Sequence, residues 1–545
     1  MKAAQLFVKC LENENVRFIF GLPGEENMDV LDALLDSAIE FIPTRHEQGA
    51  AFMADVQGRL THTAGVCLST LGPGATNLVT GVADGNLDRA PLVAVTGQAG
   101  LDRMHKESHQ VIDIVELFKP VTKWNTQIRK ASIIPEVVRK AFKLAMTERP
   151  GATHIDFPED EASAQVSDAL EPLLVQFPVP PEPLEAQVKR ASDIISGARR
   201  PVILAGNGVI RANAEDDLVR FCEKLNIPVC STFMAKGVVP ASHPLSLFSV
   251  GLQEPDYAWC ALDRSDVVIC VGYDIVEYHP ELWNPNKNKR IVHIDLLPAE
   301  VDDSYIVSVG VAGDIRLSLR EIADRSQASE NRSFTRLREL CLTEIEEAKH
   351  DRSFPLKPQN VVVDLRSVLA DDDIVISDVG VHKLWLARLY AAEKPNTCII
   401  SNGFSAMGIA VPGAISAKLH FPQARVVAAT GDGGFLMNSQ ELETAVRLET
   451  PFVSLIFNDG MYGLIGWKQQ TRFNREAFVR FRNPDFVRYA ASFGAKGYRV
   501  SAHDELVPAL QEAMEESVPT VIDCPIDFGE NVKLTKKLQA LVCPE

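Results

Sequence analysis

The chain has 545 residues, of which 46% are hydrophobic and 23% charged, as is ordinary for a globular protein of about three domains. Its 55 basic and 73 acidic residues give a net charge of −18, which argues against non-specific binding to nucleic acid or to an anionic membrane. The ten cysteines form no Cys-x-x-Cys pair, so we expect neither structural zinc nor a disulfide framework. We expect the protein to lie in a reducing compartment, the cytoplasm. No apolar run is long enough to span a membrane, and the charged N-terminus reads as a first helix and strand rather than a signal peptide.

Helix and strand patterns alternate along the first part of the chain. The expected elements, in order, are 3–14, 17–21, 28–37, 40–44 and 65–70, the first and third being helices and the others strands. Glycine turns follow two of these strands, Gly-Leu-Pro-Gly at 21–24 and Leu-Gly-Pro-Gly at 71–74. Each turn alone is commonplace, but their repetition along one parallel sheet suggests the rim of a pocket.

Two further blocks with the same alternation follow. Residues 171–188 contain five prolines and are expected to form an extended linker. The sequence therefore predicts an α/β fold of three doubly wound parallel-sheet domains, at residues 1–175, 188–345 and 357–545.

The most informative stretch lies at 424–466. Apolar runs at 425–430 and 452–457 are expected to be strands, and Asn438 or Ser439 is expected to cap the helix between them. In a parallel crossover both strands end at the same edge of the sheet, so Asp432 and Asp459 become neighbours. Two carboxylates beside a glycine turn predict a site for a divalent cation that carries a diphosphate. The alternative is an ordinary crossover with acidic residues at helix starts.

Glu47, in the segment RHEQGAAF, is a second candidate. It lies where an expected strand ends and a helix begins. From the residues alone, a functional carboxylate and a simple helix-start carboxylate are equally good interpretations.

The segment GDGGFLMNSQELETAV, with FND further on, resembles the cofactor motif of thiamine-diphosphate-dependent enzymes. The whole chain is similar to the acetolactate synthase branch of that family, whose domains bind the pyrimidine, form a central block and bind the diphosphate, in that order. The segments SNGFSAMGIAVPGAISA and YAASFGAKG are similar to the catabolic, pyruvate-specific type.

The resemblance implies thiamine diphosphate and Mg²⁺ as cofactors. It assigns Mg²⁺ to Asp432, Asp459 and the carbonyl of Met461. It makes Glu47 the catalytic group that protonates the aminopyrimidine ring at N1′, and Met407 a wedge that holds the cofactor bent, although Met is more often plain core. The remaining cofactor contacts that it implies are Thr70, Gly72, Asn77, Gly380, Val381, His382, Ser405, Gly431, Gly433, Gly434, Tyr462 and Gly463.

Substrate contacts are also implied by the resemblance. It places Gln110 near the second substrate and gives the turn at Gly24 backbone N–H groups that face reacting oxygens. Lys106 or His109 adds positive potential, or belongs to a solvated charged face. In the family, the residue at the position of Lys468 selects the 2-keto acid that acts as acceptor. Biosynthetic members have Trp there and catabolic ones Gln. Here Trp467 precedes it, so acceptor choice stays open, and packing of the lid explains Trp467 equally well.

The central block is expected to bind no FAD. Its Gly206-Asn207-Gly208 turn is followed by Arg211 where a dinucleotide fingerprint has its third glycine. FAD-containing relatives carry an Arg-Phe-Asp-Asp-Arg segment, whereas this chain has VGYDIVEYHPELWN, similar to the flavin-free type.

The resemblance implies an acetolactate synthase that condenses two pyruvate molecules to 2-acetolactate and CO₂ by way of a thiamine-diphosphate ylide and enamine. It also implies a homodimer or homotetramer with active sites between subunits, and a small 2-keto acid as the partner, with no nucleic acid or membrane. Two alternatives remain: another thiamine-diphosphate-dependent decarboxylase or carboligase, and a non-catalytic regulatory paralogue.

Overall fold

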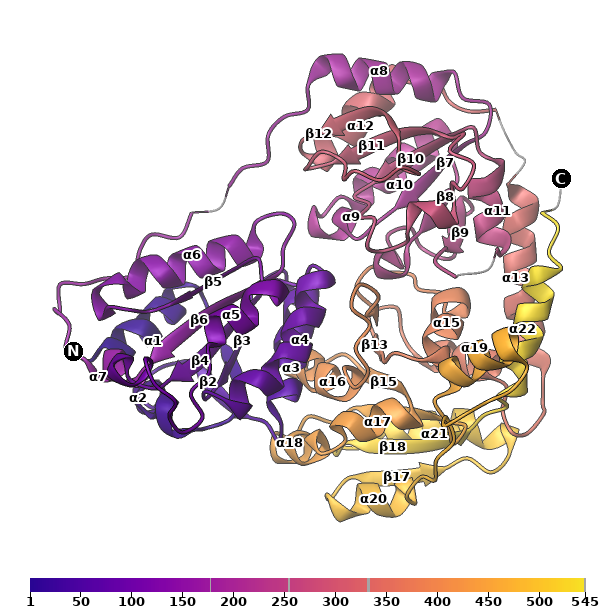
Figure 1. Cartoon of the computed structure of the whole chain (residues 1–545). Coiled ribbons are helices and arrows are strands. Elements are labelled where there is room, and N and C mark those ends of the chain that lie inside the picture. The colour runs from indigo at the N-terminus through magenta and orange to yellow at the C-terminus, as the bar shows by residue number, and fades with distance from the viewer. Residues whose placement is uncertain (177, 253–254, 331–333, 544–545) are drawn as a thin grey trace.

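The computed structural model describes residues 1–176, 178–252, 255–330 and 334–543. The positions between and after these ranges fall in the expected linker, the central block and the end of the third block. Within the described residues the chain forms three blocks, each built on a six-stranded sheet with flanking helices (Figure 1). Neighbouring strands within the sheets pair in parallel. This confirms the predicted α/β fold.

The N-terminal block is drawn in indigo and purple in Figure 1, and its sheet has the order β2-β1-β3-β4-β6-β5. The strands are β1 (Phe18–Gly21), β2 (Glu40–Pro43), β3 (Gly65–Ser69), β4 (Leu92–Gln98), β5 (Trp124–Gln127) and β6 (Ala152–Pro158). The helices are α1 (Ala3–Asn13), α2 (Met28–Leu34), α3 (Glu47–Thr61), α4 (Pro73–Leu87), α5 (Ile114–Phe118), α6 (Ile134–Met146) and α7 (Glu159–Ser163).

The central block has the sheet order β12-β11-β10-β7-β8-β9, which is the strand order of dinucleotide-binding folds. The strands are β7 (Pro201–Ala205), β8 (Val229–Ser231), β9 (Ser246–Ser249), β10 (Val267–Val271), β11 (Arg290–Asp295) and β12 (Val307–Ala312). The helices are α8 (Glu185–Ser196), α9 (Gly208–Arg211), α10 (Glu215–Leu225), α11 (Tyr257–Arg264), α12 (Ile315–Arg325) and α13 (Thr335–His350).

The C-terminal block has the sheet order β14-β13-β15-β16-β18-β17. The strands are β13 (Ile374–Ser377), β14 (Cys398–Ile400), β15 (Val426–Gly431), β16 (Val453–Asn458), β17 (Lys496–Arg499) and β18 (Thr520–Pro525). The helices are α14 (Pro358–Val368), α15 (Val381–Leu389), α16 (Ala410–His420), α17 (Asp432–Asn438), α18 (Glu441–Arg447), α19 (Gly463–Phe473), α20 (Phe486–Ser492), α21 (Leu506–Glu515) and α22 (Gly529–Gln539).

The first and third sheets share one strand order, although no repeat is visible in the sequence. β1 corresponds to β13 and β3 to β15, so the glycine turns after β1 and β3 occupy the same places as the segments after β13 and β15. In both blocks the candidate site residues therefore follow the carboxyl ends of neighbouring strands, where α/β sheets bind ligands.

Helices α3 and α16 join the N-terminal and C-terminal blocks (Figure 1). Small residues let their backbones approach, since a Cβ at Gly413 would lie 2.8 Å from Val56 Cγ2. Ser416 Oγ donates to the carbonyl of Met53 at 2.8 Å, and apolar side chains of both blocks merge into one core cluster. The two blocks are thus held in a fixed relation within one chain.

One disulfide corrects the expectation drawn from the cysteine spacing. Cys260 in α11 is bonded to Cys543, which follows α22, across 283 positions of sequence. The other eight cysteines carry free thiols. Spacing could not reveal this pair, because only the fold brings the end of the chain to the central block. None of the helices in the described ranges is long and apolar enough to cross a membrane.

Candidate cofactor site

Asp432 and Asp459 lie together, as the crossover predicted. Strands β15 and β16 pair in parallel, and each carboxylate follows its strand end. Asp432 Oδ2 accepts hydrogen bonds from the backbone N–H of Gly460 and from Asn483 Nδ2, both at 2.7 Å. The expected helix is α18, which begins at Glu441 after Gln440, one or two residues beyond the predicted cap at Asn438 or Ser439. A separate short helix that was not expected, α17, begins at Asp432 itself. The glycines after Asp432 form its first turn, and the Gly433 N–H donates to Asp432 Oδ1 at 2.8 Å.

The charge balance of this pair fits a divalent cation. Burial raises the pKa of Asp432, and burial together with the charge of Asp432 raises the pKa of Asp459 to about 7. A cation between them would relieve both effects. In the part of the chain that the structure describes, no three His, Cys, Asp or Glu side chains are grouped for metal binding. Mg²⁺, which keeps water and phosphate oxygens in its shell, suits a site with two carboxylates.

Space beside the carboxylates is kept free by glycine. A Cβ at Gly463 would lie 2.6 Å from Asp459 Oδ2, and one at Gly434 would lie 2.8 Å from Asp378 Oδ1. Gly433 faces the ring of Tyr462, where a Cβ would meet Cε1 at 2.9 Å. These glycines form a cradle that any side chain would fill.

His382 closes the other side of the cradle. Its ring lies between the ends of β13 and β15, within 3.4 Å of the positions that a Cβ at Gly380 or Gly431 would take. Burial lowers the pKa of His382 to about 3, so the imidazole is neutral. Its Nε2 is buried and has no hydrogen-bond partner among the described residues. An orphaned polar atom here fits a bound polar group, and Val381 and His382 supply the first turn of α15.

The loop at 401–408 carries Ser405 and the half-buried Met407. Lys383 Nζ donates to the Ser401 carbonyl at 3.1 Å and to Ser405 Oγ at 3.2 Å. The Gly408 N–H donates to Asp378 Oδ1 at 2.9 Å. The loop is therefore fixed by buried polar groups, with Met407 between them.

The N-terminal block brings together the other predicted residues. Glu47 begins α3, is 8% exposed, and accepts a hydrogen bond on Oε2 from Asn77 Nδ2 at 2.9 Å. The carboxylate also faces Gly74, where a Cβ would lie 3.5 Å from Glu47 Oε1 and 3.0 Å from Thr70 Cγ2. Glu47, Asn77 and Thr70 thus line one corner.

Gly24, Gly72 and Gln110 complete this corner. A Cβ at Gly24 would lie 2.4 Å from Thr70 Cβ, and one at Gly72 would lie 2.7 Å from the Gln110 carbonyl. Gln110, Lys106 and His109 are exposed in the single chain. We refer to this corner as the Glu47 half-site and to the surroundings of Asp432 and Asp459 as the Asp432 half-site.

Trp467 and Lys468 point in different directions from α19. Trp467 Nε1 donates to Thr535 Oγ1 of α22, and its ring packs against the core of the C-terminal block. Lys468 is exposed. Packing therefore accounts for Trp467.

Glu441 is a site neighbour that the sequence analysis missed. Its buried carboxylate accepts hydrogen bonds from the backbone N–H groups of Arg45 and His46, both at 3.0 Å, and from Thr444 Oγ1 at 2.6 Å. A residue of the C-terminal block thus holds the turn just before Glu47. No local signal marks this role, because the partners lie almost 400 positions apart in sequence.

Glu441→Gln is expected to change how stability depends on pH. Burial raises the pKa of Glu441 from 4.5 to about 7, so between these values the folded chain binds a proton that the unfolded chain does not. The stabilisation is complete below pH 4.5 and is lost as pH rises to 7, by at most about 1.4 kcal/mol for each pH unit. Glutamine keeps an oxygen for the N–H groups of Arg45 and His46, and its amide N–H₂ can donate to Thr444 Oγ1, without this proton. Urea unfolding of both proteins at several pH values between 5 and 7 measures the difference, and parallel curves would contradict it.

Comparisons with known proteins cover the whole fold. Residues 1–117 match the N-terminal TPP binding domain of thiamine pyrophosphate enzymes, 188–322 match their central domain, and 378–524 match their C-terminal TPP binding domain. The chain is 39% identical to a probable acetolactate synthase large subunit of Methanocaldococcus jannaschii, over 97% of this chain and 93% of the relative. It is 36% identical to the acetolactate synthase of Bacillus subtilis, over 98% and 94%. It is 35% identical to a catabolic acetolactate synthase of Raoultella terrigena, over 98% and 97%. With three matching domains in this order and relatives along its full length, the chain belongs to the thiamine pyrophosphate enzymes and, within them, to the acetolactate synthase family.

Proposed function

We propose that this enzyme condenses two pyruvate molecules to 2-acetolactate and CO₂. The observation that supports the proposal is that Glu47 is held by Asn77, and that Asp432 and Asp459 follow neighbouring parallel strands. The presence of all three carboxylates, Glu47, Asp432 and Asp459, argues against a non-catalytic regulatory paralogue.

Thiamine diphosphate would be held mainly by the Asp432 half-site. We assign Mg²⁺ to Asp432, Asp459 and the Met461 carbonyl, and the diphosphate to the segments that start α15, α17 and α19. Further contacts come from the loop at 401–408 and from Tyr462. When bound, the cofactor accepts the electrons that remain when pyruvate loses CO₂.

Glu47 has the geometry of a proton-exchanging group. Asn77 holds Oε2, and Oε1 is left facing the space beside Gly74. We assign to this carboxylate the proton that is shared with the pyrimidine ring. Thr70 and Gly72 would flank the ring, while Gln110 and the N–H groups of the turn at Gly24 would orient the substrate carboxylate and carbonyl.

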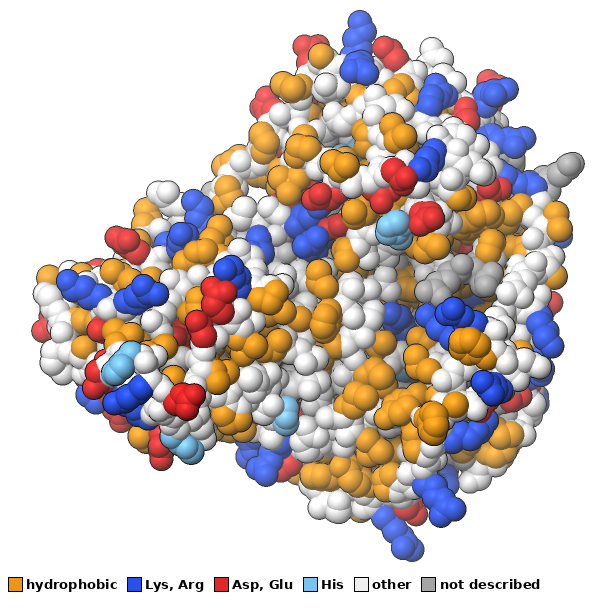
Figure 2. Space-filling model, viewed as in Figure 1, with side chains coloured by type: hydrophobic (Ala, Val, Ile, Leu, Met, Phe, Trp, Pro, Cys, Tyr) orange, Lys and Arg blue, Asp and Glu red, His pale blue; other side chains and the backbone are white. Residues whose placement is uncertain are grey.

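Exposed apolar side chains favour an oligomer. Hydrophobic side chains gather on the face of the C-terminal block in Figure 2, and those exposed around the Asp432 half-site are Phe404, Leu436, Met437, Tyr462, Ile465, Phe473 and Phe478. Contiguous apolar surface of this kind commonly marks an interface. We propose that the Glu47 half-site of a second subunit covers it, in a homodimer or a homotetramer.

The central block supports a flavin-free enzyme. All three N–H groups of its glycine turn are taken up by the protein, since Gly206 donates to the Val271 carbonyl at 2.9 Å, Gly208 to the Gly272 carbonyl at 2.8 Å, and Asn207 to the Glu277 carboxylate at 3.0 Å. The turn has no N–H group left for a dinucleotide phosphate.

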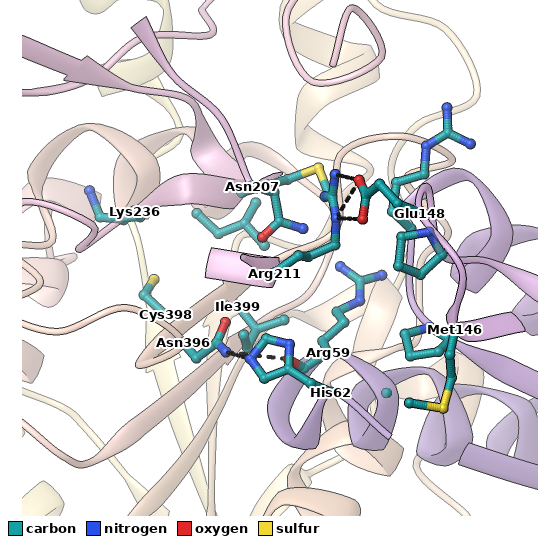
Figure 3. A pocket seen from close by; sticks show the side chains of 16 residues that line it. Arg59, His62, Met146, Glu148, Asn207, Arg211, Lys236, Asn396, Cys398 and Ile399 are labelled. Carbon is teal, nitrogen blue, oxygen red and sulfur yellow. Dashed lines mark hydrogen bonds and ion pairs between the residues drawn. The ribbon is translucent and has the colours of Figure 1, made fainter. Parts of the chain in front are cut away.

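The cavity beside this turn is also small. Figure 3 shows it between the three blocks, with Arg211 paired to Glu148 at 2.6 Å and Asn396 next to His62. Its volume is about 110 Å³, and a second cavity that touches Gly208 and Arg211 has about 230 Å³. Each is below the roughly 300–1,000 Å³ of pockets that hold drug-sized ligands. We therefore propose that FAD is not a cofactor. We further propose that the three domains extend over residues 1–175, 188–345 and 357–545, and that the enzyme acts in the cytoplasm.

Turnover of pyruvate by the purified full-length protein tests the function. With thiamine diphosphate and Mg²⁺ but no flavin, we expect one CO₂ and one 2-acetolactate for every two pyruvate molecules consumed, measured by NMR. A second candidate is a different carboligase, because the chain is also 32% identical to the putative thiamine pyrophosphate-containing protein YdaP of Bacillus subtilis. Acetaldehyde or another acyl product in place of 2-acetolactate would favour that candidate, and no turnover of any 2-keto acid would favour the regulatory paralogue.

A further inference from the structure

Two aspartates of the N-terminal block reach into the loop that carries Met407. Asp84 lies in the last turn of α4 and Asp88 follows its end, and both side chains are fully buried. Neither belongs to either half-site. Their partners are in the C-terminal block, more than 300 positions away in sequence.

The contacts are mainly to backbone N–H groups of the loop. Asp84 Oδ1 accepts from the Ala406 N–H at 3.0 Å and from Ser401 Oγ at 3.0 Å. Asp88 accepts from the Asn402 N–H at 3.2 Å and from the Gly403 N–H. A Cβ at Gly403 would lie only 2.6 Å from Asp88 Oδ1, so this close approach depends on glycine.

Arg59 of α3 provides the positive charge for this cluster. Its Nη2 lies 3.0 Å from Asp84 Oδ2 and 2.6 Å from Asp88 Oδ2, and its Nε lies 2.7 Å from Asp55 Oδ1. Asp55 is as deeply buried as the other two but has no hydrogen bond to the loop among those of the described residues. The cluster therefore contains two carboxylates that hold the loop and one that does not.

The two aspartates fix the loop on one side of Met407, and Asp378 fixes it on the other. Asp84 binds the N–H of the residue just before Met407, while Asp378 binds the N–H of Gly408 just after it. The backbone on both sides of Met407 is thus set by buried carboxylates. Backbone N–H groups that point at fixed acceptors leave the loop little freedom to shift.

We propose that Asp84 and Asp88 are positioning residues for the reaction, which set the place of Met407 and Ser405 against the bound cofactor. The inference rests on the proposed function, because the contact of Met407 with thiamine diphosphate belongs to it. Displacing a positioning element by about 1 Å can cost about 100-fold in rate, so the effect falls on turnover rather than on cofactor affinity. The cofactor affinity is set by Asp432 and Asp459. These residues follow β15 and β16, whereas the loop follows β14.

Asp84→Asn and Asp88→Asn test the proposal, with Asp55→Asn as the matched control. In each of the two test variants an amide N–H₂ replaces an oxygen that accepts from the loop, whereas Asp55→Asn changes the same Arg59 cluster without touching the loop. Asp88 lies 11 positions beyond Asn77, about 16 Å along a helix, so its substitution leaves the Glu47 half-site in place.

The full-length enzymes are compared with thiamine diphosphate and Mg²⁺ bound. We expect kcat for CO₂ release to fall about 10- to 100-fold in Asp84→Asn and Asp88→Asn, with KM and the cofactor Kd within about threefold of the parent. Asp55→Asn is expected to keep kcat within about twofold of the parent value, even if its Tm falls as far as the Tm of the Asp84→Asn and Asp88→Asn enzymes. Equal kcat values in all three variants would overturn the proposal.

Two further measurements keep the proposal testable. If the Asn variants do not fold, Ser401→Ala removes one loop contact of Asp84 and is expected to lower kcat about fivefold, and an unchanged kcat would overturn the proposal. The near-UV circular dichroism of bound thiamine diphosphate needs no substrate. It is expected to change in the Asp88→Asn enzyme and not in the Asp55→Asn enzyme, and an unchanged spectrum would overturn the inference even if pyruvate proves to be the wrong substrate.

Discussion

Glu47→Gln is expected to abolish release of CO₂ from pyruvate, with a loss of at least about 100-fold, while the protein still binds thiamine diphosphate and Mg²⁺. Glutamine has nearly the same shape and can still accept the hydrogen bond from Asn77 Nδ2. It cannot exchange a proton at this position, and positioned acid–base groups typically contribute about 10²–10⁴-fold. CO₂ release is measured at saturating cofactor, and the cofactor Kd by calorimetry, where we expect a change of less than about threefold.

Glu441→Gln is the matched control for this experiment. It is also a buried Glu→Gln change, and its carboxylate contacts the backbone of Arg45 and His46 but not the carboxylate of Glu47. We expect it to keep CO₂ release within about threefold of the parent. A Glu47→Gln enzyme as active as Glu441→Gln would refute the assigned role of Glu47.

Asp432→Ala is expected to remove Mg²⁺-dependent cofactor binding, with a loss of affinity of more than about 100-fold. The carboxylate is one of the three proposed metal ligands, and it also accepts the N–H of Gly460, which orders the segment before Met461. Loss of a hard oxygen ligand leaves Asp459 as the only carboxylate for the cation. Titration of the protein with thiamine diphosphate, at fixed Mg²⁺ and in EDTA, measures the effect.

Asp459→Asn is the comparison for this prediction. Asparagine keeps one oxygen at the ligand position and removes the charge that burial makes costly. We expect its cofactor Kd to stay within about tenfold of the parent. If Asp432→Ala binds thiamine diphosphate as the parent does, or binds it equally with and without Mg²⁺, the proposed metal site is wrong.

The strands could be predicted from the sequence because each is a short apolar run. The two strands of the Asp432 half-site were expected at 425–430 and 452–457 and lie at 426–431 and 453–458, a shift of one residue. The start of α17 could not be predicted, because glycines after Asp432 oppose a helix locally. The close packing of Gly434 against Asp378 and of Gly433 against Tyr462 explains why glycine is kept in this helix despite its low helix propensity.

The residues that support the site were harder to foresee than the site itself. Asp432 and Asp459 follow strands within one crossover, so spacing and topology were enough to pair them. Asn483, Glu441, Asp84 and Asp88 act across distances of 51 to more than 300 positions, and nothing in their local sequence indicates a partner. Packing of the N-terminal block against the C-terminal block brings Glu441, Asp84 and Asp88 to their partners, whereas Asn483 reaches Asp432 within the C-terminal block.

The bond between Cys260 and Cys543 gives the polypeptide a closed covalent ring. The ring contains β10 to β12 of the central block and the C-terminal block as far as Cys543, so a single break anywhere between these two cysteines leaves both ends of the break covalently connected. The N-terminal block lies outside the ring, and its only covalent link to it is the single stretch of chain that runs into the central block. The Glu47 half-site therefore lies outside the covalent ring, and the Asp432 half-site lies inside it.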